Sequence, residues 1–290
     1  MSGQIIGLQE WFKTPPGRYL LAWEQSQFDQ AVTDLFGYHA LQLGMPEVEG
    51  LRANRISHRW LAMPQLPPGA GGHCDAPGPV TVDPPRIALA SDSSALPFSA
   101  NSLDLVLLPH TLDLSLEPHA TLREVERVLV PEGRVVICGF NPASLWGLRQ
   151  RRGLLYKKMG LGQVFLPGVG DLISYWRLRD WLRLLSFEVE SSRFGIYRPG
   201  LRDQAWLERF RWLDPLGDRW WPIFGAVYFM VAVKRVRGMT LLNAEWKRTR
   251  ALASAPVPVT GKMHRHRGDE HNAGERRTHP LHTKDQEERR

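Results

Sequence analysis

Three short apolar runs between residues 87 and 141 constrain the fold of this 290-residue chain more than any other feature. The runs occupy residues 87–90, 103–108 and 135–138, and none of them alternates regularly between apolar and polar residues. Such runs are typical of strands that are buried on both faces, as in parallel sheets. A helical segment separates the second run from the third, and helices cover the faces of parallel sheets. The region therefore predicts an α/β fold with a mostly parallel sheet.

The helix between these runs is expected over residues 118–130. Pro118 suits the first turn of a helix, where a missing N–H leaves no hydrogen bond unmade. The Pro131-Glu132-Gly133 sequence predicts a turn that ends the helix. Apolar residues recur at helical spacing on one side of the segment, namely Leu122, Val125, Val128 and Leu129.

The same region resembles the second half of the nucleotide-binding core of class I S-adenosylmethionine-dependent methyltransferases, in particular the small-molecule, methyltransferase type 11-like group. The resemblance rests on Asp92-Ser93-Ser94-Ala95-Leu96-Pro97-Phe98, on Ser102-Leu103-Asp104-Leu105-Val106, and on Leu122-Arg123-Glu124-Val125-Glu126-Arg127-Val128-Leu129-Val130-Pro131-Glu132-Gly133-Arg134. It implies a Rossmann-like, mostly parallel seven-stranded sheet with helices on both faces and an antiparallel last strand.

Flanking segments supply the other elements of such a fold. Strands are expected over residues 38–44, 57–63, 187–194 and 225–235, and helices over 18–36 and 171–185. We expect an N-terminal helical lead-in over 1–36 and a methyltransferase-like domain over 37–235, with substrate-side insertions at about 142–170 and 195–221. The Pro- and Gly-rich residues 64–85 predict a flexible connection, and residues 236–290 predict an extension that is disordered from about 254.

The loop after the strand at 38–44 departs from the family pattern. The family usually has Gly-x-Gly-x-Gly there, so that backbone N–H groups approach the methionine end of the cofactor. This chain reads Gly44-Met45-Pro46-Glu47-Val48-Glu49-Gly50, which keeps only the first glycine of the motif. Gln65 follows the next strand, where an acidic residue usually binds the ribose hydroxyls. The resemblance thus implies a cofactor site with a degenerate glycine motif.

The resemblance implies S-adenosylmethionine as the cofactor, bound near Gly44, Gln65, Asp92, Leu96 and Pro109. Asp92 corresponds to the acidic residue that meets the adenine amino group, although aspartate is also a common turn or capping residue. His110 follows the fourth strand, at the edge where ligands of parallel sheets lie. A histidine there suits a general base, and a histidine that is hydrogen-bonded at a strand end is the alternative.

Asn141 and Trp146 are expected to face the methyl acceptor. The segment 149–158 interleaves basic with apolar residues, which suits a cap over an acidic or lipid-like substrate or adsorption to a membrane surface. A solvated basic helix face is the alternative. Four tryptophans within residues 195–221 predict a helical lid that aromatic side chains pack.

Composition limits the compartment and the partners. The formal net charge is +7, a modest excess that favours acidic substrates but does not by itself indicate a nucleic-acid-binding protein. No apolar segment approaches the ~20 residues that span a bilayer, and the N-terminus has no signal-peptide pattern. Cys74 and Cys138 make neither a disulfide framework nor a metal set, and the histidines near the C-terminus match no zinc spacing. We expect a cytoplasmic protein without a metal site.

These residues predict a methyltransferase that acts by direct displacement, in which an O, N or C nucleophile of an unidentified small-molecule acceptor attacks the sulfonium methyl. One alternative is a catalytically inactive protein of the same fold that binds a ligand or a protein partner, which Met45 and Pro46 favour. An RNA-modifying enzyme is a weaker alternative, because Asn141-Pro142 follows the fifth strand, whereas the motif of amino-group methyltransferases should follow the fourth.

Overall fold

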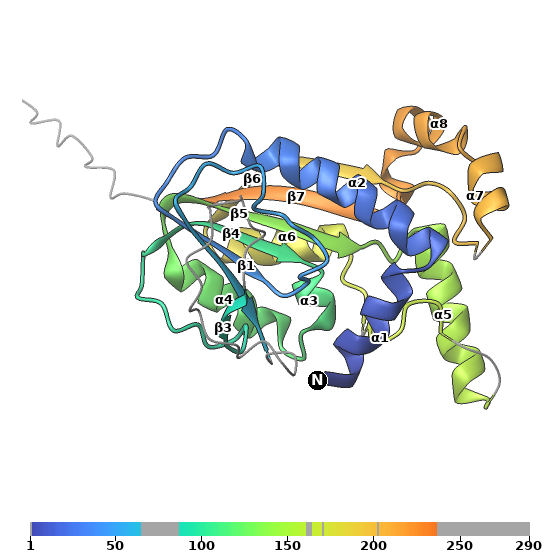
Figure 1. Cartoon of the computed structure of the whole chain (residues 1–290), viewed down its shortest axis with the longest axis horizontal. Helices are drawn as coiled ribbons and strands as arrows, with labels where there is room; N and C mark the ends of the chain where they lie inside the picture. The colour runs from blue at the N-terminus through green and yellow to red at the C-terminus, as the bar shows by residue number, and fades with distance from the viewer. Residues whose placement is uncertain (1, 65–86, 161–163, 170, 202, 237–290) are drawn as a thin grey trace, which may run out of the picture. The chain divides into compact units, whose positions relative to one another are not determined.

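The computed structural model describes residues 2–64, 87–160, 164–169, 171–201 and 203–236, which form a seven-stranded sheet flanked by helices (Figure 1). Across the sheet the strands follow the order β3-β2-β1-β4-β5-β7-β6, and β7 alone runs antiparallel to its neighbours β5 and β6. The predicted mostly parallel sheet with an antiparallel last strand is confirmed. The strands are β1 (His39–Leu43), β2 (His58–Met63), β3 (Ile87–Ala90), β4 (Leu103–Pro109), β5 (Leu129–Phe140), β6 (Phe187–Gly195) and β7 (Val227–Lys234).

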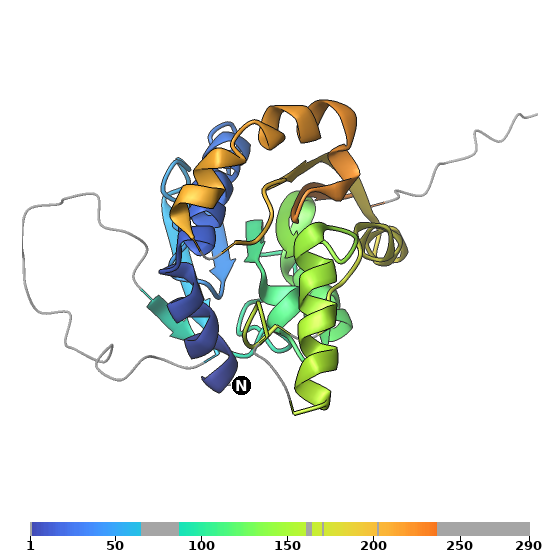
Figure 2. The same ribbon diagram turned by 90° about the vertical axis from the view of Figure 1, so that its right-hand side faces the viewer.

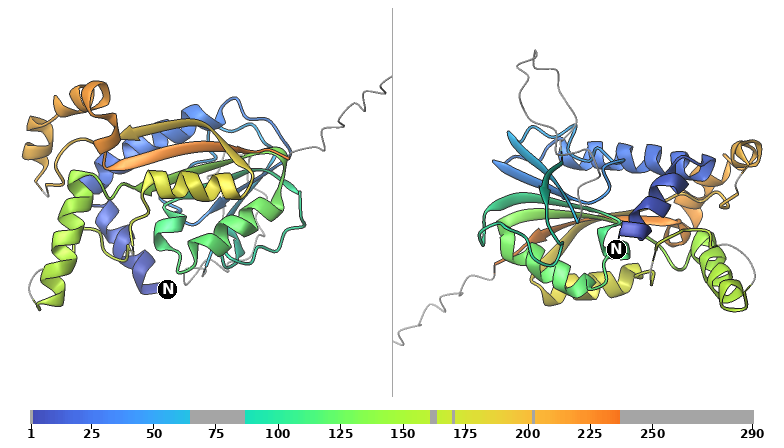
Figure 3. Two further views of the ribbon diagram at one scale, coloured as in Figure 1. Left: turned by 180° about the vertical axis from the view of Figure 1, so that it is seen from behind. Right: turned by 60° about the horizontal axis from the view of Figure 1, so that its bottom comes forward.

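Helices cover both faces of the sheet, as predicted (Figure 3). The helices α1 (Ser2–Phe12) and α2 (Pro15–Val32) bury Leu8 and Phe28 against one face. The helices α4 (Pro118–Val128) and α6 (Tyr175–Leu184) bury Val125 and Leu182 against the other. The remaining helical elements are α3 (Thr111–Leu114), α5 (Leu145–Lys158), α7 (Gln204–Arg209), α8 (Leu213–Trp220) and the 3-10 turn η1 (Pro222–Phe224).

The predicted helix over 18–36 begins earlier, at Pro15, and ends at Val32. Thr14 caps it, because its Oγ1 accepts a hydrogen bond from the N–H of Gly17 at 3.4 Å. Pro15 and Pro16 occupy the first turn, where their missing N–H groups have no partner to lose. The prolines therefore start the helix rather than precede it, and α1 is an additional helix that shares the core of the sheet.

The predicted turn at Pro131-Glu132-Gly133 lies inside β5 as an irregularity of the strand. Leu103 pairs with Leu129 and Leu105 with Arg134, so residues 130–133 have no counterpart of their own on β4. Glu132 takes a φ of 65°, which permits the sharp reversal that a regular strand would not. The helix α4 consequently ends at Val128, and β5 already begins at Leu129.

Helices α5, α7 and α8 gather at one edge of the sheet (Figures 1 and 2). The helix α5 follows β5, α7 follows β6, and α8 precedes β7. Since β5 and β6 run opposite to β7, all three connections leave the sheet at the carboxyl ends of its parallel strands.

The segment 195–221 is helical, as predicted, but its tryptophans do not pack it. The side chains of Trp206, Trp212, Trp220 and Trp221 are between 48% and 66% exposed. Packing comes instead from the buried Leu207 and from Gly217, where an added Cβ would lie 2.3 Å from the Tyr197 ring. The four tryptophans therefore face outward, whereas Tyr197 packs inside the segment.

Two of the predicted segments lie outside the described residues. The connection at 64–85 does so except for Pro64, and the C-terminal extension does so except for Val236. Within the described residues, no helix is both long and apolar enough to cross a bilayer.

Candidate cofactor site

A pocket opens where β1, β2 and β3 end, with α3 on one side of it. It is partly open to solvent, and the centre of a water-sized sphere can occupy about 50 Å³ of it. Ligands of parallel sheets bind beyond the carboxyl ends of the strands, which is where this pocket lies. Gly44 and Asp92 are the predicted cofactor residues that line it. The other lining residues are Leu43, Met45, Ala62, Pro64, Ser91, Ser93, Thr111, Leu114 and Ser115.

The loop after β1 is held by the buried side chain of Gln42. Its Nε2 donates hydrogen bonds to the backbone oxygens of Met45 (2.9 Å) and Val48 (2.7 Å). Its Oε1 accepts a hydrogen bond from the N–H of Gly50 at 3.1 Å. One amide side chain therefore fixes both ends of the loop that replaces the family's glycine-rich motif.

Gly44 leaves the backbone at the start of this loop accessible from the pocket, because it has no side chain. Its φ of 74° is strained for any residue with a side chain, and a Cβ there would meet only Thr111 Oγ1, at 3.8 Å. Met45 also takes a left-handed φ, of 50°, but its side chain is buried in the core beside α2. The loop thus presents the backbone of Gly44 to the pocket although the later glycines of the motif are missing.

Asp92 forms a turn and also borders the pocket. Its Oδ1 accepts a hydrogen bond from the N–H of Ser94 at 3.1 Å, which closes the turn after β3. The side chain is exposed, and its Oδ2 has no hydrogen-bond partner among the described residues. The carboxylate can therefore accept a hydrogen bond from a ligand without giving up the turn.

Leu96 and Pro109 do not border the pocket. The N–H of Leu96 is donated to Glu124 Oε1 at 2.9 Å, and the Leu96 side chain is buried. The backbone oxygen of Pro109 accepts a hydrogen bond from Thr111 Oγ1 at 3.4 Å. Pro109 thereby supports Thr111, which lines the pocket, and contact of Leu96 or Pro109 with a cofactor stays a prediction. Gln65 lies outside the described residues.

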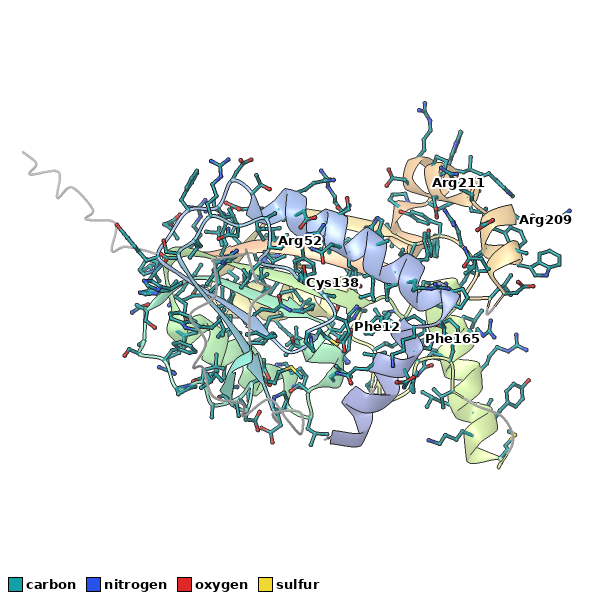
Figure 4. All side chains as sticks on the ribbon, viewed as in Figure 1. Phe12, Arg52, Cys138, Phe165, Arg209 and Arg211 are labelled. Carbon is teal, nitrogen blue, oxygen red and sulfur yellow. The ribbon has the colours of Figure 1, made fainter. Side chains whose placement is uncertain are left out.

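His110 lies in a buried network instead of on the pocket wall. Its side chain is fully buried, and its ring stacks on Phe140 with a centroid separation of 4.1 Å. Its Nε2 lies 2.6 Å from Glu24 Oε1, and its Nδ1 lies 3.2 Å from Asp113 Oδ2. The thiol of Cys138 donates to the same Glu24 oxygen at 3.4 Å, and Figure 4 places Cys138 beneath α2.

The two carboxylates keep His110 charged. Burial alone would lower the pKa of His110, but the charges and hydrogen bonds of Glu24 and Asp113 outweigh burial and raise this pKa to about 9. Both ring nitrogens then donate hydrogen bonds, and the ring has no lone pair to accept a proton at neutral pH. This geometry does not support the predicted role of His110 as a general base, and it matches the alternative of a histidine that is hydrogen-bonded at a strand end.

Glu24, His110 and Cys138 are also residue types that bind metals, and their ligand atoms lie within 4.8 Å of one another. Two ligands of a tetrahedral zinc ion are about 3.3 Å apart, given metal–ligand bonds of about 2 Å. The 2.6 Å between His110 Nε2 and Glu24 Oε1 is shorter and is a hydrogen-bond distance. The cluster as it stands is therefore joined by hydrogen bonds.

Asn141 and Trp146 serve as internal connectors. Asn141 Nδ2 donates to the backbone oxygens of Ile223 (2.7 Å) and Gly225 (2.9 Å). Trp146 is 1% exposed, and its Nε1 donates to the backbone oxygen of Arg198 at 2.8 Å. Neither residue lines the pocket, so the expectation that they face the acceptor has no support in this geometry; they tie α5 to the segment around α7, α8 and η1.

Sequence reasoning placed Thr111 of α3 at the ligand edge of the sheet but missed Leu114 and the two buried polar residues Gln42 and Glu24. A signal for Glu24 exists, because it lies four residues from Leu20 and four from Phe28 on the apolar stripe of α2. Gln42 likewise interrupts a strand that is otherwise apolar from Ala40 to Leu43. A polar residue on an apolar face needs a buried partner, and this need marks both positions.

Two comparisons with known proteins relate this chain to other sequences. Residues 80–137 match a family model described as a methyltransferase domain. The uncharacterized protein YafS of Escherichia coli (strain K12) is 34% identical over 194 residues, which are 66% of this chain and 70% of that protein.

Solved structures are similar to this chain at low sequence identity. One is a candidate methyltransferase from Haloferax volcanii in complex with the methyltransferase activator Trm112, with a TM-score of 0.51 and 16% identity over 80% of this chain and 97% of that chain. Another is an S-adenosylmethionine-dependent methyltransferase from Thermotoga maritima, with a TM-score of 0.49 and 14% identity over 78% of this chain and 94% of that chain. At 16% identity, the similarity to the Haloferax volcanii protein shows a shared fold and nothing about activity.

Proposed function

The chain belongs to the class I S-adenosylmethionine-dependent methyltransferases, and we propose that it transfers the methyl group of this cofactor to a small-molecule acceptor. The observation that carries the proposal is the pocket at the ends of β1, β2 and β3. It combines an open backbone at Gly44 with the exposed carboxylate of Asp92, the two features that bind the opposite ends of such a cofactor in the family. Apolar residues such as Leu43 and Leu114 line the space between them.

The chemical groups that line the pocket are of the types that bind S-adenosylmethionine. Asp92 would accept a hydrogen bond from the adenine amino group, and the backbone at Gly44 would approach the methionine end. Thr111 donates to the backbone oxygen of Leu43 at 2.5 Å and so fixes the wall between these two points. When bound, S-adenosylmethionine supplies a methyl group on a sulfonium, which a nucleophile displaces directly. The protein then has to align the acceptor and exclude water.

The pocket supplies few groups that could remove a proton from the acceptor. Among the described lining residues, Asp92 is the one titratable side chain, and His110 is buried and protonated. A nearby base is needed only when the acceptor is a weak nucleophile in its protonated form. We therefore favour acceptors that are nucleophilic at neutral pH without the help of a base, such as carboxylates.

The competing function is ligand or partner binding without catalysis. Met45 stands where the family has no side chain, and its left-handed backbone fixes a loop without the usual glycines. A loop that cannot accommodate the methionine end of the cofactor would leave only the adenine half of the site. The two functions are therefore distinguished by cofactor affinity.

Calorimetric titration of the purified full chain with S-adenosylmethionine and S-adenosylhomocysteine tests the proposal. We expect binding that weakens by about tenfold or more in Asp92→Asn, because a hydrogen bond to a charged group is worth about 1.5–3 kcal/mol. The exchange keeps Oδ1 as the acceptor for the Ser94 N–H, so the turn should survive. Asp203→Asn is a matched control, because Asp203 Oδ1 accepts from the N–H of Ala205 at 3.1 Å in the same kind of turn, away from the pocket.

Two outcomes would contradict the proposal. If neither ligand binds the wild-type protein, the pocket does not hold this cofactor, and ligand or partner binding without catalysis becomes the better explanation of the fold. If Asp92→Asn and Asp203→Asn weaken binding equally, Asp92 acts through the turn and not through contact with the ligand.

A further inference from the structure

Large apolar side chains are exposed on α5, α7, α8 and η1. On α5, Leu148, Leu155, Tyr156 and Met159, which caps its C-terminal end, are between 46% and 62% exposed. On the segment from α7 to η1, the four exposed tryptophans are joined by Phe224, which is 57% exposed. A scattered apolar residue on a surface is ordinary, but a cluster of this kind marks an interaction site.

These side chains share one edge of the protein, because α5, α7 and α8 all leave the sheet at the carboxyl ends of its parallel strands (Figures 1 and 3). Asn141 ties the start of α5 to Ile223 and Gly225, and Trp146 ties α5 to Arg198. The cofactor pocket lies at the same edge of the sheet, since β1 and β5 run in the same direction. We call the exposed side chains of α5, α7, α8 and η1 the apolar edge.

The second half of α5 extends beyond the body of the protein (Figure 2). Trp146, Gly147 and Gln150 are buried, whereas Leu155, Tyr156 and Lys157 all are exposed. Successive residues of a helix point in different directions, so Leu155 and Tyr156 lie on different sides of the tip. A medium that covers both side chains would therefore surround the tip.

The charge of α5 indicates which medium this is. The helix holds five Lys or Arg and no Asp or Glu. On the neighbouring segment, Arg209 and Arg211 are exposed at the outer side of the same end of the molecule (Figure 4). Asp203, Glu208 and Asp218 are exposed on that segment too, so the basic excess comes from α5. Basic residues mixed with Leu, Tyr and Trp are typical of protein surfaces that enter the headgroup region of a bilayer, where Trp and Tyr are enriched and Lys and Arg meet anionic lipids.

We propose that the apolar edge docks on the surface of an anionic phospholipid bilayer, with the tip of α5 and the tryptophans of α7 and α8 entering the headgroup region. RNA would match the basic charge but not the exposed Leu155, Tyr156 and Met159. A protein partner would need an apolar cleft that encloses the protruding tip, whereas the headgroup region of a bilayer covers it without one. Because the cofactor pocket lies at the same edge, docking would deliver acceptors from the bilayer, and the acceptor would be an amphiphilic lipid. This second part rests on the proposed methyltransferase function, whereas the docking does not.

Vesicle cosedimentation of the full chain tests the docking. Phosphatidylcholine vesicles with and without phosphatidylglycerol are the two probes, and we expect stronger binding to the anionic vesicles. The double variant Leu155→Ser/Tyr156→Ser should weaken binding by removing inserted apolar surface. The double variant Arg151→Glu/Lys157→Glu should weaken it by about tenfold or more, because each basic residue near an anionic surface is worth about 1 kcal/mol, or roughly fivefold.

A control and a second ligand separate the alternatives. Arg183→Glu/Leu184→Ser changes the same residue types on α6, where Leu184 is 83% exposed, and it should bind vesicles like the wild type. Heparin and single-stranded RNA serve as soluble polyanions. Binding to these polyanions as strong as binding to vesicles, and unaffected by Leu155→Ser/Tyr156→Ser, would overturn the proposal in favour of a nucleic-acid surface. Absence of binding to either vesicle would overturn it as well.

The acceptor class is tested with isotope-labelled S-adenosylmethionine and a lipid extract. Label that passes into the organic phase, and that decreases with Leu155→Ser/Tyr156→Ser, supports a lipid acceptor. Vesicle binding by a protein that binds no S-adenosylmethionine would leave the docking intact and refute the methyltransferase function. Cofactor binding without vesicle binding would do the reverse, so the two failures are distinguishable.

Discussion

Replacing Glu24 with glutamine tests whether His110 carries a positive charge inside the protein. In the wild type, Glu24 Oε1 lies 2.6 Å from His110 Nε2, and both side chains are fully buried. The exchange removes the carboxylate charge but keeps a side chain of nearly the same size. Asp113 remains as a weaker partner, at 3.2 Å from Nδ1.

The expected pH dependence follows from the raised pKa of His110. The folded protein holds this proton up to about pH 9, whereas the unfolded chain releases it near the ordinary pKa of 6.5. The stabilisation is therefore complete below about pH 6.5, and it is lost as the pH rises through about 9. The difference between these two pKa values corresponds to about 3 kcal/mol of unfolding free energy, at 1.36 kcal/mol for each pH unit.

Urea unfolding at a series of pH values measures this dependence. The wild type should lose about 3 kcal/mol of unfolding free energy between about pH 6.5 and 9, or about 6–12 °C in melting temperature for a domain of this size. Glu24→Gln should be less stable than the wild type at the lower pH, and its decrease over the same range should be at most half as large. The stability gap between the two proteins should therefore narrow as the pH rises.

His119→Gln is the matched control, because His119 is an exposed histidine on α4. It should reproduce the pH dependence of the wild type. An identical decrease in the wild type and in Glu24→Gln would refute the reasoning, because Glu24 would then not hold the proton on His110. A wild-type stability that rises over this pH range would refute it as well, and an NMR titration of the His110 ring would report the pKa directly.

Buried polar groups support three shorter predictions. Gln42→Leu should lower the unfolding free energy by about 2–4 kcal/mol and weaken cofactor binding, because it leaves buried backbone groups of the loop after β1 without partners; an unchanged urea midpoint would contradict this. Tyr228→Phe should raise the unfolding free energy by about 1 kcal/mol, since the Tyr228 hydroxyl is buried without a partner among the described residues, and a lower melting temperature would count against it. In a Cys74→Ser background, Cys138 should resist iodoacetamide until urea unfolds the protein, because burial raises the pKa of its thiol; fast labelling of the folded protein would show that the thiol is accessible.

The parts of the site that follow a strand directly were predictable. Gly44 and Asp92 stand immediately after β1 and just beyond β3, and the parallel order of the strands brings both to one pocket. Pro109 ends β4 and Leu96 follows β3 by six residues, yet the first supports Thr111 and the second donates its N–H to Glu124. A family motif locates such a residue on the chain but does not say which of its atoms are already used.

The sequence by itself determined the sheet and its strands, because strand and helix patterns are local and repeat every two or 3.6 residues. It also located Gly44 and Asp92, the two predicted residues that line the pocket. Only the tertiary structure decided the state of His110, since its partner Glu24 lies 86 residues away on another element. It also turned Trp146 inward to Arg198 and left Trp220 and its neighbours outside. Whether a polar or aromatic side chain is buried depends on which distant element packs against it, and no local pattern records that choice.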